Sequence, residues 1–161
     1  MSHTVTVEQY ESLIQAALQA RDGSYSPYSK FRVGAALLTA EGETIKGANV
    51  ENASYGGTIC AERSALCKAV TDGKKNFLAI AVAADVPSAS VSPCGICRQF
   101  IREFCPLTTP IVMVSSTYQT GDYTNDQQAV NEKNKTTVTM TLEQLLPMSF
   151  GPDELKMGQR S

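Results

Sequence analysis

Several features that would direct a protein to a membrane or divide it into units are missing from this sequence. No segment approaches the roughly 20 consecutive apolar residues of a membrane helix, and no charged leader precedes an apolar run. We therefore expect no membrane partner and a soluble, cytoplasmic protein. Internal repeats and low-complexity tracts are also absent, so the 161 residues predict one domain over 1–161, with an irregular tail from about residue 147.

Basic clusters and histidine are scarce as well. Lysine and arginine number 14 against 16 acidic residues, the formal net charge is −2, and the longest basic cluster is Lys74-Lys75. Because nucleic-acid-binding domains concentrate positive charge, the sequence shows no electrostatic sign of a polynucleotide partner and favours a small-molecule substrate, so we expect no nucleic-acid partner. The single histidine, His3, lies in a terminus expected to fray, so we do not expect it to bind a metal.

The five cysteines are an odd number, and without a secretory signal they do not predict a disulfide framework. Cys94 and Cys97 form a Cys-x-x-Cys pair, which indicates metal or redox chemistry. A thioredoxin-like redox motif would account for this pair, but it explains neither Cys60 nor Glu62.

Cys60, Cys94 and Cys97 together match the ligand number of a catalytic zinc, which keeps three protein ligands and leaves a fourth position for water. Glu62 is expected to be the general base beside that water, since a fourth protein ligand would exclude it. A structural zinc site normally has four ligands in two pairs, and Cys60 has no paired partner nearby.

The other two cysteines are not needed for this site. Cys67 lies two helical turns beyond Cys60 on the predicted helix, too far along it to share the same ion. We expect Cys67 to be a buried apolar residue, and we assign Cys105, which precedes Pro106, to packing.

Hydrophobic periodicity and turn residues predict an α/β protein. The predicted helices are Val7 to Arg21, Cys60 to Asp72, Pro93 to Phe104 and a short one from Thr141 to Leu146. The predicted strands are Phe31 to Leu37, Thr44 to Val50, Phe77 to Ala84, Ile111 to Ser115 and Thr136 to Met140. Thr120 to Lys135 is expected to be an exposed loop. This order predicts three layers, α/β/α, around a mixed five-stranded sheet.

Two predicted helix N-termini carry the cysteines. If they face each other, their partial positive charges offset the negative charge of three thiolates. Arg63 lies on the same helical face as Cys60 and can hydrogen-bond its thiolate from outside the ligand set. The polar segment from Asn49 to Thr58 leads into Cys60, and two interpretations stay open: side chains that reach a small molecule, or a solvated turn.

The combination of Cys60-Ala61-Glu62-Arg63 with Pro93-Cys94-Gly95-Ile96-Cys97 resembles the small cytidine deaminases of the three-cysteine zinc type. The similarity runs from the first helix to Pro152, and the separate motifs occur in the order of the family. The flanking motifs that agree are Phe31-Arg32-Val33-Gly34-Ala35-Ala36-Leu37, Asn49-Val50-Glu51-Asn52-Ala53-Ser54-Tyr55 and Leu145-Leu146-Pro147-Met148-Ser149-Phe150-Gly151-Pro152.

The resemblance implies a cytidine deaminase-like fold and hydrolytic deamination of cytidine and deoxycytidine, with release of ammonia. Cys60, Cys94 and Cys97 would hold one Zn²⁺ per chain. Glu62 would activate the water, pass a proton to N3 of cytosine and later protonate the departing amine. The activity would belong to pyrimidine salvage.

The resemblance also implies how the substrate is bound. Asn49 and Glu51 would hydrogen-bond the ribose hydroxyls, and we expect Glu51 to be a buried carboxylate that rejects a free base. Members of the family with one short domain form homotetramers with shared active sites. The remaining implied contacts are Phe31 near sugar and base, Tyr55 in the same substrate-binding motif, backbone of Ala61, Pro93 and Cys94 at the pyrimidine edge, and Phe150 on the base of a neighbouring subunit.

Three alternatives stay open. A blasticidin-S-type deaminase of the same fold would share the zinc site and Glu62, although the ribose-reading Asn49 and Glu51 favour a plain nucleoside. An enzyme that edits polynucleotides is disfavoured because the chain is acidic. A non-enzymatic, zinc-stabilised interaction module is disfavoured by the open ligand set.

Overall fold

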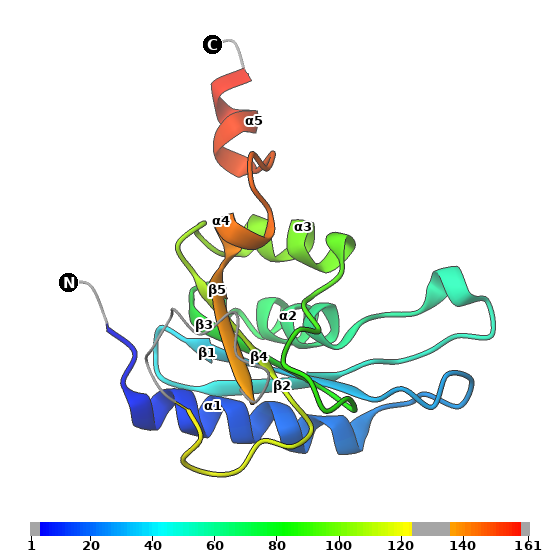
Figure 1. Ribbon diagram of the computed structural model, residues 1–161. Helices are drawn as coiled ribbons and strands as arrows, with labels where there is room; N and C mark the ends of the chain where they lie inside the picture. Colours follow the sequence, from blue (N-terminus) through cyan, green and yellow to red (C-terminus); the bar gives the residue numbers. More distant parts are fainter. Residues whose placement is uncertain (1–3, 124–135, 159–161) are drawn as a thin grey trace.

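The structure is a computed structural model that describes residues 4–123 and 136–158 (Figure 1). Most of the predicted loop from Thr120 to Lys135 lies outside these residues, as does His3. The main helices are α1 (Val7–Ala20), α2 (Ala61–Thr71), α3 (Gly95–Phe104), α4 (Leu142–Leu145) and α5 (Pro152–Gly158). The strands are β1 (Val33–Thr39), β2 (Thr44–Ala48), β3 (Phe77–Ala84), β4 (Pro110–Val114) and β5 (Thr137–Thr141).

The sheet has the order β2-β1-β3-β4-β5. β3 and β4 are parallel and the other neighbouring pairs are antiparallel, which confirms the predicted mixed five-stranded sheet. A parallel pair requires a crossover connection, and α3 supplies it between β3 and β4. The N-terminus of α3 is thereby placed at the same edge of the sheet as the end of β3.

Helices cover both faces of the sheet, as Figure 1 shows. On one face, α1 buries Leu13, Ile14 and Ala17 against alternate residues of β1, β3 and β4. On the other face, α2, α3 and α4 enclose a second cluster that includes Leu66, Ile101 and Leu142. Both faces of the central strands are therefore buried, and the predicted three-layer α/β/α fold is confirmed.

Capping boxes begin two of the helices. The Thr6 hydroxyl accepts a hydrogen bond from the Gln9 backbone N–H at 3.2 Å, and the Gln9 side chain accepts one from the Thr6 N–H at 2.9 Å. Thr141 and Gln144 form the same reciprocal pair at the start of α4. These local interactions begin two helices where the sequence predicted them.

Other element boundaries differ from the predictions. β1 begins at Val33, so Phe31 precedes the strand, and α3 begins at Gly95 rather than at Pro93. The tail is not irregular throughout, because it contains α5. This helix has a proline at its first position and two acidic residues in its first turn, both of which favour a helix N-terminus. Among the described residues, none of the helices combines the length and the apolar character of a bilayer span.

A glycine in β2 allows α2 to lie directly on the sheet. A Cβ atom built on Gly47 would lie 2.4 Å from the Ala65 backbone nitrogen and 2.8 Å from the Ala61 carbonyl oxygen. No flexible side chain could move aside there, since both contacts are backbone atoms of α2. Gly47 therefore fixes how close α2 lies to the sheet.

We expect Gly47→Ala to lower the free energy of unfolding by about 2–3 kcal/mol, because a methyl group must push α2 off the strand. The urea midpoint of unfolding measures this change. Gly56→Ala is the matched control, because a Cβ atom there meets nothing within 4 Å. Equal midpoints for the two variants would contradict the packing argument.

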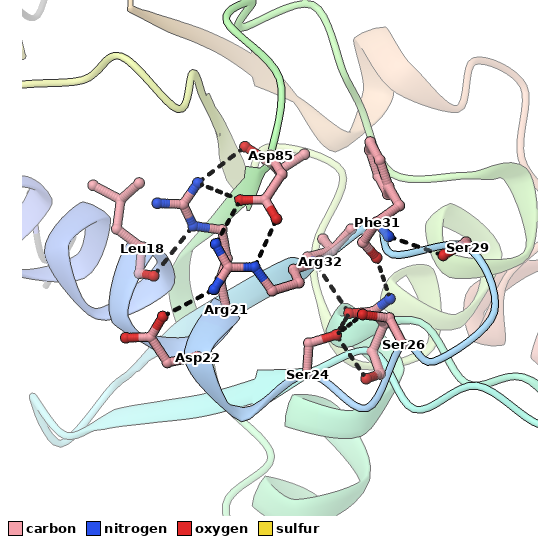
Figure 2. A network of polar contacts seen from close by, with 12 residues as sticks. Leu18, Arg21, Asp22, Ser24, Ser26, Ser29, Phe31, Arg32 and Asp85 are labelled. Atoms are coloured by element: carbon pink, nitrogen blue, oxygen red, sulfur yellow. Dashed lines mark hydrogen bonds and ion pairs between the residues drawn. The ribbon is translucent and has the colours of Figure 1, made fainter.

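An ion-pair network joins α1 to the segment that precedes β1 (Figure 2). The Asp85 carboxylate, just after β3, accepts hydrogen bonds from Arg32 at 2.7 Å and from Arg21 at 3.1 Å. Desolvation opposes the charged form of Asp85, but the hydrogen bond and the charge of Arg32, together with Arg21, lower its pKa overall. The network holds the backbone that leads from Phe31 into β1.

Candidate metal centre

Two cysteines occupy the N-cap positions of two helices. Cys60 precedes α2 and Cys94 precedes α3, both with extended backbone and without a side-chain capping bond. Cys97 lies in the first turn of α3 and is buried. The Cys60 and Cys94 sulfur atoms are 3.9 Å apart, and all three Sγ atoms lie within 4.8 Å of one another. The two helix N-termini therefore converge, which is the condition under which their partial charges can offset those of the thiolates.

This donor set fits zinc. Zinc–sulfur bonds of about 2.3 Å in a tetrahedron separate two sulfurs by about 3.8 Å, close to the observed distance between Cys60 and Cys94. Thiolates are donors that zinc prefers. The part of the chain that the structure describes holds one such group of three or more candidate ligands.

The remaining cysteines lie outside the cluster. Cys105 is buried, as predicted for a packing residue, and burial raises the pKa of its thiol to about 12. Cys67 is exposed, so the prediction of a buried apolar side chain is wrong. Two helical turns of axial rise separate Cys67 from the metal site, and its side chain meets solvent there rather than another helix or the sheet.

The thiols are electrostatically linked to each other and to Arg63. A hydrogen bond from Cys97, together with Arg63 and Cys94, lowers the pKa of Cys60 to about 5 against the opposing effect of burial. The same hydrogen bond raises the pKa of Cys97, which holds the shared proton. Arg63 Nη2 lies 3.7 Å from Cys60 Sγ, so the predicted contact of the guanidinium with a thiolate is present.

Glu62 lies beside the thiols in the first turn of α2. It is 4% exposed, and its pKa is raised because burial and then the Cys60 thiolate disfavour its charged form. A carboxyl group with a raised pKa is suited to accept a proton and return it. A buried acid next to three potential metal ligands is the arrangement that metal-assisted hydrolysis requires.

The loop that carries Pro93 and Cys94 is held by an arginine to which the sequence analysis gave no role. Arg98 donates to the Pro93 carbonyl oxygen, the Leu145 carbonyl oxygen and the Ser92 hydroxyl, each at 2.6 Å. These bonds tie the start of α3 to the end of α4. The sequence offered one signal for this role, because Arg98 directly follows Cys97 and its basic side chain can reach back over the first turn of α3.

Asn49 is 8% exposed, and its side chain forms hydrogen bonds within its own chain. Its Oδ1 accepts from the Val33 N–H at 2.9 Å and from the Ser24 hydroxyl at 2.5 Å, while Nδ2 donates to the Phe31 carbonyl oxygen at 2.9 Å. An amide Nδ2 carries a second hydrogen besides the one that bonds Phe31. Asn49 therefore positions the backbone around Phe31 whatever else it binds.

Glu51 is half-buried rather than buried, so that prediction needs correction. Its carboxylate accepts hydrogen bonds from the Tyr28 N–H at 2.9 Å, from the Ser29 N–H at 3.2 Å and from the Ser29 hydroxyl. The Ser29 hydroxyl is the main reason why the Glu51 pKa is lowered. Glu51 stays partly accessible to solvent because its partners, Tyr28 and Ser29, are themselves exposed.

The predicted aromatic contacts lie at the surface. Phe31, Tyr55 and Phe150 are exposed, and the Tyr55 ring lies 5.9 Å from that of Tyr28. Ala61 is buried as the first residue of α2. The structure thus brings together Cys60, Cys94, Cys97, Glu62 and Arg63, while the contacts of the other predicted residues with a substrate stay predictions.

The sequence model of the cytidine and deoxycytidylate deaminase zinc-binding region matches residues 7–113. This range holds the three clustered cysteines and Glu62. The chain belongs to this deaminase family. Because the zinc-binding region of the family contains the thiol cluster, zinc is the metal of this centre.

Three proteins of the deaminase family illustrate how much of the chain is matched. The cytidine deaminase of Halalkalibacterium halodurans is 44% identical over 145 residues, which are 90% of this chain and 96% of the relative. The crystal structure of cytidine deaminase from Burkholderia pseudomallei has a TM-score of 0.72 at 37% identity and covers 88% of this chain and 98% of its own. Cytidine deaminase from Mycobacterium tuberculosis gives a TM-score of 0.66 at 32% identity, with coverage of 88% and 97%.

Proposed function

We propose that this protein is a zinc-dependent cytidine deaminase that converts cytidine and deoxycytidine to uridine and deoxyuridine and releases ammonia. The observation that carries the proposal is the cluster of Cys60, Cys94 and Cys97 with the buried acid Glu62 beside it, in a chain of the deaminase family. The relatives that match most of the chain bear the name cytidine deaminase.

Residues of the site have separate roles in the reaction. Cys60, Cys94 and Cys97 hold the zinc, which when bound activates water at neutral pH. Glu62 takes one proton from the attacking water and delivers it to N3 of the cytosine ring. It then takes the remaining proton from the new C4 hydroxyl group and gives it to the amine, which leaves as ammonia. Its burial keeps bulk water from competing for that proton. Arg63 offsets part of the negative charge of the thiolates.

We assign substrate recognition chiefly to the polar segment that leads into Cys60. We infer that Asn49 and Glu51 bind the ribose hydroxyls, while backbone groups of Ala61 and of the Pro93–Cys94 link read the pyrimidine edge. Phe31 and Tyr55 line the approach. The support is positional, since Asn49 holds the Phe31 carbonyl and Glu51 follows two residues later on the same segment.

We also propose that the chain forms one deaminase domain that assembles into a homotetramer with shared active sites, and that it serves pyrimidine salvage in the cytoplasm. Support for assembly comes from the outer face of α3, where a hollow of about 670 Å³ has a mainly apolar lining. Exposed Ile96 lies in this hollow, and a second copy of the chain would remove it from water. The residues that line the hollow are Gly95, Ile96, Gln99, Phe100, Glu103 and Phe104.

Ultraviolet absorbance with cytidine, deoxycytidine, cytosine and blasticidin S in parallel tests the proposal, with zinc per chain measured on the same sample. We expect conversion of both nucleosides, little conversion of the free base, and about one zinc per chain. Conversion of blasticidin S alone would favour an antibiotic deaminase of the same fold. Bound zinc with no conversion would overturn the enzymatic proposal.

A further inference from the structure

Phe150 combines a fixed backbone with an exposed ring. The Gln99 side chain of α3 donates to the Phe150 carbonyl oxygen at 2.9 Å, yet the residue is 61% exposed. Nearby Met148 has a φ of 54°, which turns the chain sharply just before this point. An aromatic residue whose backbone is held while its ring faces outward is arranged to contact something outside its own subunit.

Arg102 of α3 holds the chain on the other side of Phe150. The residue is 6% exposed, and its Nη2 lies 3.2 Å from Glu154 Oε2, in the first turn of α5. The same carboxylate oxygen accepts a hydrogen bond from the Gly151 N–H at 2.8 Å. One oxygen of Glu154 therefore joins α3 to the residue that directly follows Phe150.

Gly151 lies flat against the Arg102 guanidinium. A Cβ atom at position 151 would be 2.5 Å from Arg102 Cζ, so the backbone reaches this distance only because the residue is glycine. The Leu155 N–H also donates to the Gly151 carbonyl oxygen at 3.1 Å, which connects the turn to α5. Gly151 is thus held on both of its peptide groups.

We propose that Arg102 and Glu154 are positioning residues that act through Phe150, by setting the direction in which its ring projects toward the nucleoside base in the neighbouring subunit. This inference rests on the proposed function. A buried guanidinium without a partner is costly, so the pair holds the tail in one place. α3 carries Cys97 at one end and Arg102 further along, so one rigid helix connects the metal centre to the tail.

The first test compares Glu154→Ala with Asp153→Ala. Both variants lose one carboxylate from the first turn of α5, but Asp153 is 72% exposed and lies 3.8 Å from Arg102. We expect Glu154→Ala to raise KM for cytidine by about three- to tenfold with kcat changed less than about twofold. Asp153→Ala should leave both constants near those of the parent protein. Equal effects of the two variants would overturn the proposal.

The second test repeats Glu154→Ala in a Phe150→Ala background. If Glu154 acts through Phe150, the substitution raises KM in the parent protein and adds nothing once the ring is absent. The same rise in both backgrounds would show that the pair acts elsewhere, and an unchanged KM in Phe150→Ala alone would also overturn the inference. A melting curve and the zinc content of each variant separate a loss of positioning from a loss of folding.

These outcomes separate the inference from the function on which it rests. A parent protein that converts neither cytidine nor deoxycytidine refutes the proposed function. An active parent protein in which Phe150→Ala raises KM and Glu154→Ala does not refutes the positioning role alone.

Discussion

Glu62→Gln is expected to lower kcat for cytidine by about 10³-fold or more, while zinc stays at about one per chain. The amide keeps the size of the side chain but cannot take a proton from water or return it to N3 and the leaving amine. Since Glu62 is not needed as a zinc ligand, the thiol cluster is left intact. KM should change far less than kcat, because the interaction that is lost acts during proton transfer.

Steady-state kinetics and metal analysis on the same preparation measure this effect. Glu41→Gln is the matched control, because it removes one carboxylate from the exposed turn between β1 and β2. It should leave kcat, KM and zinc unchanged. A Glu62→Gln protein that deaminates cytidine at the parent rate would refute the proposed mechanism, and loss of zinc from it would make Glu62 a ligand.

Cys94→Ala is expected to lose both the metal and the activity, with zinc falling from about one per chain to near zero at neutral pH. Cys94 supplies one of three thiols, and two protein ligands do not retain zinc against a chelator. Its side chain is exposed and takes no part in capping α3, so the fold should survive the substitution. Turnover should fall by more than about 10³-fold, because water is no longer activated.

Metal analysis after dialysis against a chelator, with circular dichroism to follow the fold, checks this expectation. Cys67→Ala provides the control, since this thiol is exposed and lies outside the cluster. It should keep full zinc and full activity. Zinc retained by Cys94→Ala, or lost equally from Cys67→Ala, would show that the ligand set is assigned incorrectly.

Much of this fold could be predicted because its signals are local. The periodicity of Leu13, Ile14 and Ala17 predicts the buried face of α1, and Thr6 with Gln9 predicts where that helix begins. The continuous apolar run of β3 predicts a strand buried on both faces. The zinc ligands could be predicted as well, because the Cys-x-x-Cys pair and Cys60-Ala61-Glu62 place the thiols and the acid within short local motifs.

Other features could not be predicted because they depend on contacts between distant segments. Glu51 is half-buried since its partners, Tyr28 and Ser29, come from a loop more than 20 residues earlier. Cys67 was taken for a packing residue, yet its side of α2 faces away from the sheet. Polar and apolar residues are mixed along α2, so its composition alone did not predict which of its faces would be buried.

The sequence by itself determined the elements of the layered core, the mixed sheet, the three thiols and the adjacent acid, since each depends on the type and spacing of neighbouring residues, whereas it did not predict α5. Only the tertiary structure decided that Gly47 lets α2 lie on the sheet, that Arg98 ties the start of α3 to α4, and that Arg102 and Glu154 hold the tail beside α3. These contacts join segments far apart in the chain, and their energies exist only once packing has brought the segments together.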